Sequence, residues 1–339
     1  MMSSWLAFLL IILAGIMQGS YFLGLKYMGS WKWENIWALY ASWALIIMPI
    51  LLALGTVPHP GEVFSLAPRS AISRLLLYGV AWGVGSVLSG LGVDRMGLAM
   101  GVSVLIGVQA VIGSFVPLVA NTPELVLQRK GLMVIASVLT LLIGLALVAF
   151  AGRERERSQP RAGNHARENA FATGLAICVF SGIFSAMLNL GFAFSAPVVK
   201  AAVAVGAKES GALNAVWAIA LFGGFIPNAA YTGYLLTRNK TWANYTLPRT
   251  SLCWLVGLMM ALLWYAGIIL YGRGAAGMGQ IGAVIGWPLF MALIILTSSI
   301  WGFVTGEWKT ASVRAKHLMK SGLGVLVVAS VLLGIANWS

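Results

Sequence analysis

Ten apolar stretches of about twenty residues follow one another along this chain, and short connections carry nearly all of its charge. About twenty residues at 1.5 Å rise per residue cross the ~30 Å hydrocarbon core of a bilayer as a helix. In lipid every backbone N–H and C=O must be paired within the segment, so such stretches are helical. The predicted fold class is therefore an all-α polytopic membrane protein with ten transmembrane helices, at residues 4–25, 35–55, 72–93, 98–120, 131–151, 170–194, 212–237, 250–272, 281–305 and 321–338.

Composition agrees with this prediction. Hydrophobic residues make up 60% of the chain and charged residues 9%, against about 25% charged residues in an ordinary globular domain. The net charge of +13 could indicate a nucleic-acid partner, but the basic residues flank the apolar stretches, which is typical of topology signals. We therefore expect a lipid bilayer around the protein and no nucleic acid.

The most polar connection separates five spans from five spans. It predicts a first five-helix repeat at 1–151, a charged cytoplasmic linker at 152–169 and a second five-helix repeat at 170–339. An odd number of spans in each half inserts the second half upside down, as in transporters built from two inverted repeats. Trp82 and Trp264 stand at corresponding positions of the third and eighth spans, which favours a duplication.

Orientation follows from the basic residues on each side. The connections on the linker side carry fifteen Lys and Arg, and the opposite side carries seven. Because basic residues concentrate in cytoplasmic loops, this bias predicts that both termini lie outside and that the linker lies in the cytoplasm.

Acidic residues are scarce and lie at the edges of the spans. Glu34 opens the second span, Asp94 closes the third and Glu307 closes the ninth. Charged groups at membrane depth usually mark chemistry, and the spans contain no paired carboxylates, Ser-Lys dyad or cluster with metal-ligand spacing. We therefore predict that the protein is not an enzyme and has no catalytic residue, metal site or cofactor.

Neutral polar and aromatic side chains are what the spans offer to a ligand. Amides and hydroxyls both donate and accept hydrogen bonds, and aromatic faces pack on the C–H faces of a sugar ring. The alternatives are that buried amides join helices and that aromatic residues form interfacial belts, as expected for Trp31, Trp33, Trp254 and Trp338. The candidate substrate-binding residues are Gln18, Tyr21, Trp82, Gln109, Asn189, Asn214, Trp264 and Trp287.

Several segments resemble a known family. They are Lys26 with the run Trp-Lys-Trp-Glu-Asn-Ile-Trp at 31–37, Trp-Gly-Val-Gly at 82–85, Ser-Gly-Ile-Phe-Ser-Ala at 181–186 and Gly-Glu-Trp at 306–308. In these segments, which are spread over nearly the whole chain, the sequence resembles the L-rhamnose–proton symporters of the drug/metabolite transporter superfamily. The resemblance implies ten spans in two inverted repeats and alternating access around a central cavity.

The resemblance also implies a function. It is uptake of L-rhamnose or a similar neutral deoxy-sugar with protons across a bacterial inner membrane. The positions shared with the family include Lys26, Trp37, the candidate tryptophans of the spans and two acids, Glu34 and Glu307, which are the candidates for proton coupling. An acid expected early in the ninth span is absent from residues 281–287.

Three alternatives stay open at this point. Without the acid in the ninth span, the chain could be a facilitator for sugars or other metabolites without proton coupling. An exporter of lipophilic cations would want an acid deep in the membrane, and none is present. A membrane enzyme or sensor would need a catalytic cluster or an output domain. The sequence does not predict the oligomeric state.

Overall fold

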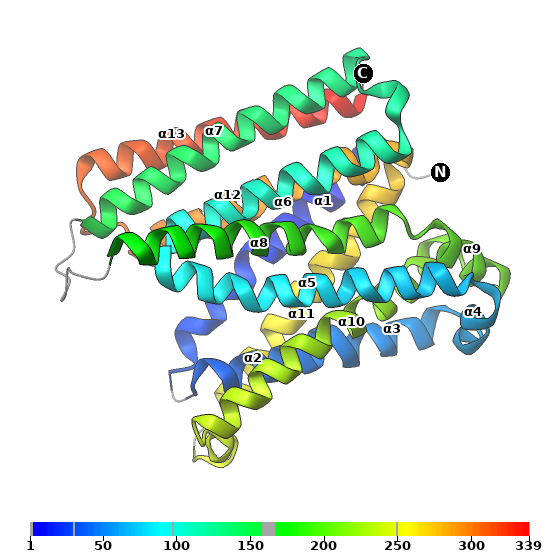
Figure 1. Cartoon of the computed structure of the whole chain (residues 1–339), viewed down its shortest axis with the longest axis horizontal. Helices are drawn as coiled ribbons and strands as arrows, with labels where there is room; N and C mark the ends of the chain where they lie inside the picture. Colours follow the sequence, from blue (N-terminus) through cyan, green and yellow to red (C-terminus); the bar gives the residue numbers. More distant parts are fainter. Residues whose placement is uncertain (1–2, 30, 97, 158–166, 249, 339) are drawn as a thin grey trace.

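A computed structural model describes residues 3–29, 31–96, 98–157, 167–248 and 250–338 of the chain. Every regular element among these residues is helical, with short 3₁₀ or π segments labelled η (Figure 1). In chain order the elements are α1 (Ser4–Ser20), η1 (Tyr21–Tyr27), α2 (Trp33–Ala41), η2 (Ser42–Ile47), α3 (Met48–Thr56), α4 (Pro60–Leu66), α5 (Arg69–Met96), α6 (Leu98–Asn121), η3 (Pro123–Leu125), α7 (Arg129–Arg157), α8 (Arg167–Ala193), α9 (Ala196–Ala204), α10 (Glu209–Arg238), η4 (Trp242–Thr246), α11 (Ser251–Gly277), η5 (Gly279–Ile281), α12 (Gly282–Val304) and α13 (Val313–Trp338).

The ten predicted spans are confirmed. Ten helical segments of the described chain are long and apolar enough to cross a membrane, from Ser4–Tyr27 to Val313–Asn337. Two short helices, α4 and α9, lie in connections that were predicted to be loops. The helix α7 continues to Arg157 and α8 begins at Arg167, so parts of the predicted linker are helical. Residues 158–166 of that linker lie outside the described residues.

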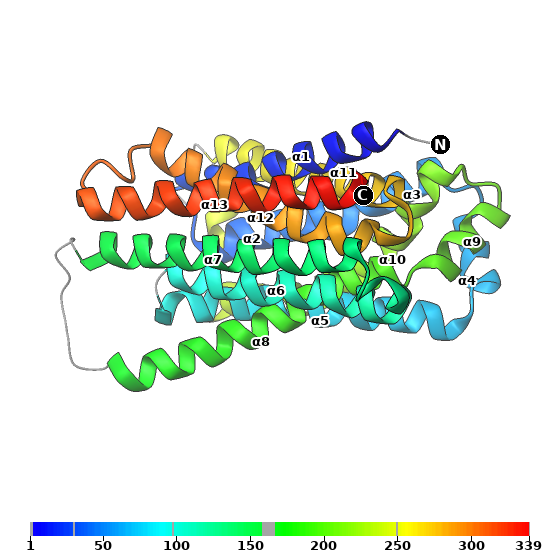
Figure 2. The same ribbon diagram turned by 90° about the horizontal axis from the view of Figure 1, so that it is seen from above.

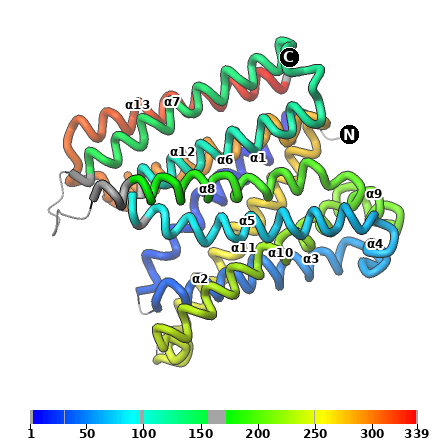
Figure 3. The backbone as a smooth tube through the Cα atoms, viewed as in Figure 1, coloured from blue at the N-terminus to red at the C-terminus, as the bar shows by residue number. Residues whose placement is uncertain are grey.

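The helices run roughly along the long axis of the molecule (Figures 1 and 3). The helices α7 and α13 lie side by side at one edge, and α2, α3 and α10 form the opposite edge (Figures 1 and 2). Both chain termini point to the same end of the bundle. The other end, where η1, α5, α7 and α12 finish and α8 begins, is called the linker face below.

Glycines allow α5 and α10 to touch at the level of their backbones. A Cβ atom added at Gly79 would lie 1.9 Å from the carbonyl oxygen of Ala220, and one at Gly83 would lie 2.4 Å from that of Gly224. Small residues permit such close approach between membrane helices, where dispersion contacts replace the hydrophobic effect. This contact fixes the position of Trp82, which lies between the two glycines of α5 in sequence.

The first two spans both leave α-helical geometry, the first over its last seven residues and the second near its middle. The first becomes a 3₁₀ helix at Tyr21, and the second becomes a π-helix over Ser42–Ile47. The π segment ends just before Pro49, which has no N–H to donate and whose ring conflicts with the carbonyl four residues earlier. Such interruptions are frequent at functional sites, and both of these spans contribute to the cavity described next.

Candidate functional site

A cavity of about 370 Å³ lies within the bundle. Small-molecule sites typically measure roughly 300–1,000 Å³, so the cavity is large enough for one small ligand. Its lining residues come from α1, η1, α2, α5, α6, α8, α11 and α12, and all of them are described and uncharged. The polar and aromatic members are Gln18, Tyr21, Phe22, Trp33, Trp37, Trp82, Ser86, Ser89, Gln109, Ser185, Trp264, Trp287 and Phe290.

The cavity opens toward the linker face. Near that face its lining includes Phe22 and Trp33, which are 46% and 39% exposed, and Gly90 in the last turns of α5. Trp287 and Phe290 of α12 line its other end and are each 2% exposed. The structure therefore has a mouth on the linker face and a closed floor toward the end of the bundle where the termini lie.

Aromatic rings form a continuous series along one side of this cavity, in which four tryptophans line it and Tyr40 lies behind them. Trp33 stacks on Trp37 with ring centroids 5.2 Å apart, and Trp37 contacts Tyr40 at 5.0 Å. Tyr40 meets Trp264 edge-on, and Trp264 lies 5.5 Å from Trp82 at an interplanar angle of 35°. This wall of rings extends from the mouth to mid-depth and presents ring faces and edges with the indole N–H groups at their rims. Such a surface suits the apolar face of a ring-shaped ligand.

Two glycines provide the space for the side chains on this wall. A Cβ at Gly224 would lie 2.6 Å from the ring of Trp82, and a Cβ at Gly267 would lie 2.8 Å from Cγ of Gln18. Both distances are shorter than ordinary contacts, so each glycine is required by the side chain that packs on it. The orientation of these cavity side chains is thus fixed from behind by the neighbouring helix.

The hydrogen-bonding groups of the cavity are only partly used by the protein. Gln18 Nε2 donates to the carbonyl oxygen of Trp264 at 3.0 Å, and Gln109 Nε2 makes a long 3.5 Å contact to that of Ser185. Both amide oxygens are left as acceptors. The indole N–H groups of Trp82 and Trp264 have no protein acceptor within the described chain. The cavity therefore offers acceptors and donors without net charge.

Asn189 holds the region below the floor together. Its Nδ2 donates to the carbonyl oxygens of Gly113 at 2.7 Å and Ala283 at 3.2 Å, and its Oδ1 accepts from the Tyr271 hydroxyl. It is fully buried and ties α6, α8, α11 and α12 together. Because its amide is already used by the protein, Asn189 supports the floor instead of lining the cavity.

The floor residue Trp287 is held by the same group of helices. Its Nε1 donates to the carbonyl oxygen of Gln109 at 3.1 Å, and Gly113 leaves room for the ring. Tyr271 contacts both Trp287 and Phe290, with centroids 5.3 and 4.9 Å apart. This packed group blocks the path from the cavity to the opposite end of the bundle.

The structure brings together six of the eight candidate binding residues and leaves two apart. Gln18, Tyr21, Trp82, Gln109, Trp264 and Trp287 all line the cavity. Asn214 is outside the lining, where its Nδ2 donates to Thr56 Oγ1 at 2.9 Å and joins α10 to the end of α3. Asn189 is the second candidate outside the lining, because it supports the floor.

Trp33 and Trp37 line the cavity but are not among the candidate binding residues that the sequence predicts. Trp33 was expected in the interfacial belt, but it lies at the mouth of the cavity. Trp37 Nε1 donates to Asn228 Oδ1 at 2.8 Å, which orients the indole. The signal was present in the spacing, because Trp33, Trp37 and Tyr40 recur on one face of a helix.

Glu34 does not line the cavity. It follows Trp33 at the start of α2 and is only 5% exposed. One carboxylate oxygen accepts from Asn239 Nδ2 and from Thr241 Oγ1, both at 2.9 Å. These neutral donors tie α2 to the end of α10. No ion pair to Glu34 occurs among the described residues.

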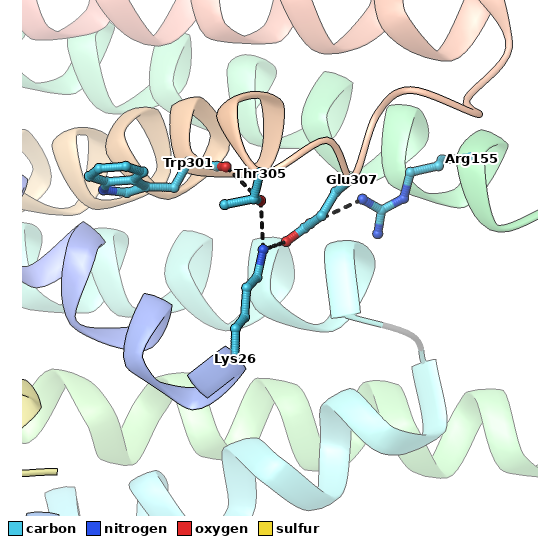
Figure 4. Close-up of polar contacts among 5 residues, drawn as sticks. All are labelled: Lys26, Arg155, Trp301, Thr305 and Glu307. Carbon is cyan, nitrogen blue, oxygen red and sulfur yellow. Dashed lines mark hydrogen bonds and ion pairs between the residues drawn. The ribbon is translucent and has the colours of Figure 1, made fainter. Parts of the chain in front are cut away.

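Glu307 belongs to a charged cluster on the linker face (Figure 4). Lys26 Nζ pairs with Glu307 Oε1 and donates to Thr305 Oγ1 at 2.6 Å, and Arg155 Nη1 lies 3.4 Å from Glu307 Oε2. Burial raises the pKa of the Glu307 carboxyl, but the hydrogen bond and charge of Lys26 and the charge of Arg155 outweigh it, so the pKa lies below its ordinary value of 4.5. Glu307 is therefore charged at neutral pH.

The described residues hold no group of three or more His, Cys, Asp and Glu side chains able to bind a metal ion. Cys178 and Cys253 are both buried. The side chain of Asp94, the third acid at a span edge, lies outside the described residues. What the site presents is a neutral, aromatic-walled cavity with a charged cluster beside its mouth.

Comparison with known proteins covers nearly the whole chain. The family model described as RhaT, L-rhamnose-proton symport protein, matches residues 4–339. The L-rhamnose-proton symporter of the Crooks strain of Escherichia coli is 28% identical over 317 residues, covering 91% of each chain. The protein of the same name from Shigella boydii serotype 18 has the same identity and coverage. No solved structure matches the chain.

Proposed function

We propose a function that starts from family membership: the chain belongs to the L-rhamnose-proton symport protein family, which is a family of transporters. It carries L-rhamnose or a similar neutral deoxy-sugar across a bacterial inner membrane, together with protons, by alternating access. The linker lies in the cytoplasm and both termini lie outside, as the distribution of basic residues favours. In this orientation the present structure is open to the cytoplasm.

One observation carries the sugar assignment, namely a cavity whose lining is aromatic and amide-bearing but uncharged. A neutral sugar needs hydrogen-bond donors and acceptors for its hydroxyls and an apolar surface for its C–H face. Gln18 and Gln109 supply the amide oxygens, and Trp82 and Trp264 supply ring surface at 5.5 Å from each other. A lipophilic cation would instead need an acid to neutralise it, and no residue of the lining is acidic.

We further propose that the two halves of the chain form inverted repeats that meet at the cavity. In support, the first half contributes α1, η1, α2, α5 and α6 to the lining, and the second contributes α8, α11 and α12. Reorientation would open the floor around Trp287 while the mouth near Trp33 closes. Transporters of this plan bind substrate between their halves near the midplane.

For proton coupling we propose Glu34 as the first residue to test and Glu307 as the second. Glu34 is buried with neutral hydrogen-bond partners, so it can lose its charge without leaving a cation unpaired. Glu307 faces two cations, which hold it in the charged form in this state. A facilitator without coupling is the second candidate, favoured by the absence of any carboxylate from the cavity lining.

The test is uptake of radiolabelled L-rhamnose into proteoliposomes, with and without an inward proton gradient. Accumulation against the sugar gradient that requires the proton gradient supports symport. Equilibration without accumulation supports the facilitator. The variant Gln18→Leu in the same liposomes should lower sugar affinity, whereas Lys320→Gln at an exposed position of α13 should not.

If protein that elutes as a folded species takes up no L-rhamnose, the assignment of L-rhamnose as the substrate is refuted. Unchanged affinity in Gln18→Leu would refute the assignment of the cavity. The two failures are separable because the first concerns the wild-type chain and the second concerns one side chain.

A further inference from the structure

The segment η1 connects the cavity to the charged cluster. It begins with Tyr21 and Phe22, which line the cavity, and ends near Lys26, which reaches Glu307. A 3₁₀ helix of this length has poorer hydrogen-bond geometry than an α-helix, so its position depends more on side-chain contacts. These include the close packing of Gly24 on Met260 of α11 and the contacts at its two ends. At its start, Ser20 Oγ accepts from Trp301 Nε1 at 2.8 Å.

The far end of η1 is held by Glu307, which is itself fixed by the turn that ends α12. Gly306 adopts a left-handed conformation with φ of +81°, and the Glu307 N–H donates to the carbonyl oxygen of Gly302 at 2.9 Å. This is the pattern of a glycine-terminated helix. It directs the carboxylate back toward α12, where Lys26 reaches both Glu307 and Thr305 (Figure 4).

The second cation of the cluster, Arg155, comes from α7 and is also held in place. Its guanidinium lies 4.9 Å from the ring centroid of Trp308, which is itself only 5% exposed. Side-chain exposure is 16% for Arg155, against about 40% for Lys26 and Glu307. The cluster thus joins η1, α7 and the end of α12 at the edge of the membrane, and Lys26 is the member that comes from η1.

We propose that the Lys26–Glu307–Arg155 cluster is a latch that holds η1 against the end of α12 and so keeps the cavity open toward the linker face. With η1 held to the end of α12, Tyr21 stays stacked on Tyr40 of α2, Phe22 stays beside it, and the mouth beside α5 stays free. Release of Lys26 lets η1 move toward α5 and close the mouth. Lys26 and Arg155 are positioning residues, because they act through Glu307 and do not line the cavity.

The latch is weak enough to break in each transport cycle. Two of its three side chains are about 40% exposed, and ion pairs at that exposure shift an equilibrium by about 1.5- to 5-fold. Among the described side chains, the charged groups facing Glu307 are Lys26 from η1 and Arg155 from α7, and Lys309 follows in the same turn, with its side chain against Gly306. Loss of the Lys26 charge therefore leaves Glu307 paired with Arg155 and removes the ion pair that holds η1.

The experiment reads opening of the mouth directly. Ser89→Cys places a thiol on the lining near the mouth, and a membrane-impermeant maleimide is applied to vesicles from each side. Cys178 and Cys253 are 0% and 3% exposed, and the parent chain without the new thiol gives the background. The labelling rate from the linker face measures the population of the open state without any sugar present.

Lys26→Gln should lower that rate by about 1.5- to 5-fold, and Glu307→Gln should lower it likewise. Lys26→Arg keeps the charge and should restore the wild-type rate. Lys320→Gln is the matched control, since it removes a charge from an exposed position at the start of α13 and should change nothing. The latch is overturned if the labelling rate is unchanged or faster in both Gln variants. It is also overturned if the rate in Lys26→Arg is as low as the rate in Lys26→Gln.

This inference rests on the proposed alternating access, but its failure is distinguishable from failure of the proposed function. The maleimide reports on the mouth whether or not L-rhamnose is the substrate. Conversely, L-rhamnose uptake with labelling rates that ignore Lys26 would leave the transport function standing and remove the latch alone. Glu307→Gln keeps the test decisive if Lys26→Gln does not yield folded protein.

Discussion

Gly113 is the position where one added methyl group should damage the cavity floor most directly. A Cβ atom there would lie 2.3 Å from Cδ1 and 2.4 Å from Nε1 of Trp287, against at least 3.4 Å for an ordinary contact. In Gly113→Ala the indole therefore has to move by about 1 Å. Its N–H then leaves the carbonyl oxygen of Gln109, which it reaches at 3.1 Å in the native packing.

The expected cost follows from these two effects. Overpacking a buried position costs about 1–3 kcal/mol, and a lost hydrogen bond costs about 0.5–1.5 kcal/mol. Replacing a helical glycine by alanine returns about 0.5–1 kcal/mol. The net loss in free energy of unfolding should be about 1–3 kcal/mol, measured by unfolding in mixed detergent and SDS micelles. Sugar affinity should also fall, because Trp287 lines the cavity.

Two variants show whether Trp287 is the cause. Gly90 also lies in a helix that lines the cavity, but a Cβ there would meet nothing within 4 Å, so Gly90→Ala should be neutral or stabilising. In a Trp287→Ala background the new methyl enters vacated space, and Gly113→Ala should cost little. Equal stability of Gly113→Ala and Gly90→Ala, or additive losses in the double variant, would refute the packing described here.

Further outcomes are expected elsewhere in the chain. Glu34→Gln should abolish gradient-driven accumulation of sugar but preserve counterflow, and loss of both would show a structural role instead. Asn214→Leu removes the hydrogen bond to Thr56 outside the cavity, so it should cost about 1 kcal/mol of stability without changing sugar affinity in a binding assay. The pKa of Glu307 is lowered, so the latch to Lys26 is present above pH 4.5 and is lost as pH falls through the lowered pKa. The labelling rate itself rises with pH because maleimide reacts with the thiolate, so the quantity to compare is the rate of Ser89→Cys with Lys26 divided by the rate with Lys26→Gln at the same pH. This ratio should be constant from about pH 6 to 8, and a ratio that falls toward one within that range would contradict the lowered pKa.

Three candidate binding residues whose buried amide or indole has few other uses lie on the cavity lining, namely Gln18, Gln109 and Trp264, and their role in binding stays a prediction. Asn214 is also an amide within a predicted span, yet its side chain joins α10 to α3. The physical reason is that a membrane span is apolar on its lipid side as well as on its buried side, so its sequence carries little information on which way each residue faces.

Trp33 shows that the sequence can also fail to identify a residue that does line the cavity. Its place at the start of a span is typical of an interfacial belt, and an exposed fraction of 39% agrees with that location. It nevertheless stacks on Trp37 and forms the mouth of the cavity. Interface and mouth coincide here because the cavity opens at the membrane edge, which depends on how α2 packs on its neighbours.

The ten spans follow from the amino-acid sequence by itself, because lipid imposes a local rule: each segment must pair its own backbone and match the thickness of the bilayer. The tertiary structure alone decides which side chains meet. Gln18 donates to the carbonyl of Trp264, 246 residues away, and Lys26 reaches Glu307, 281 residues away. These contacts depend on the rotation and tilt of each helix, which are set by packing at positions such as Gly267 and Gly113, and packing is a property of the whole bundle.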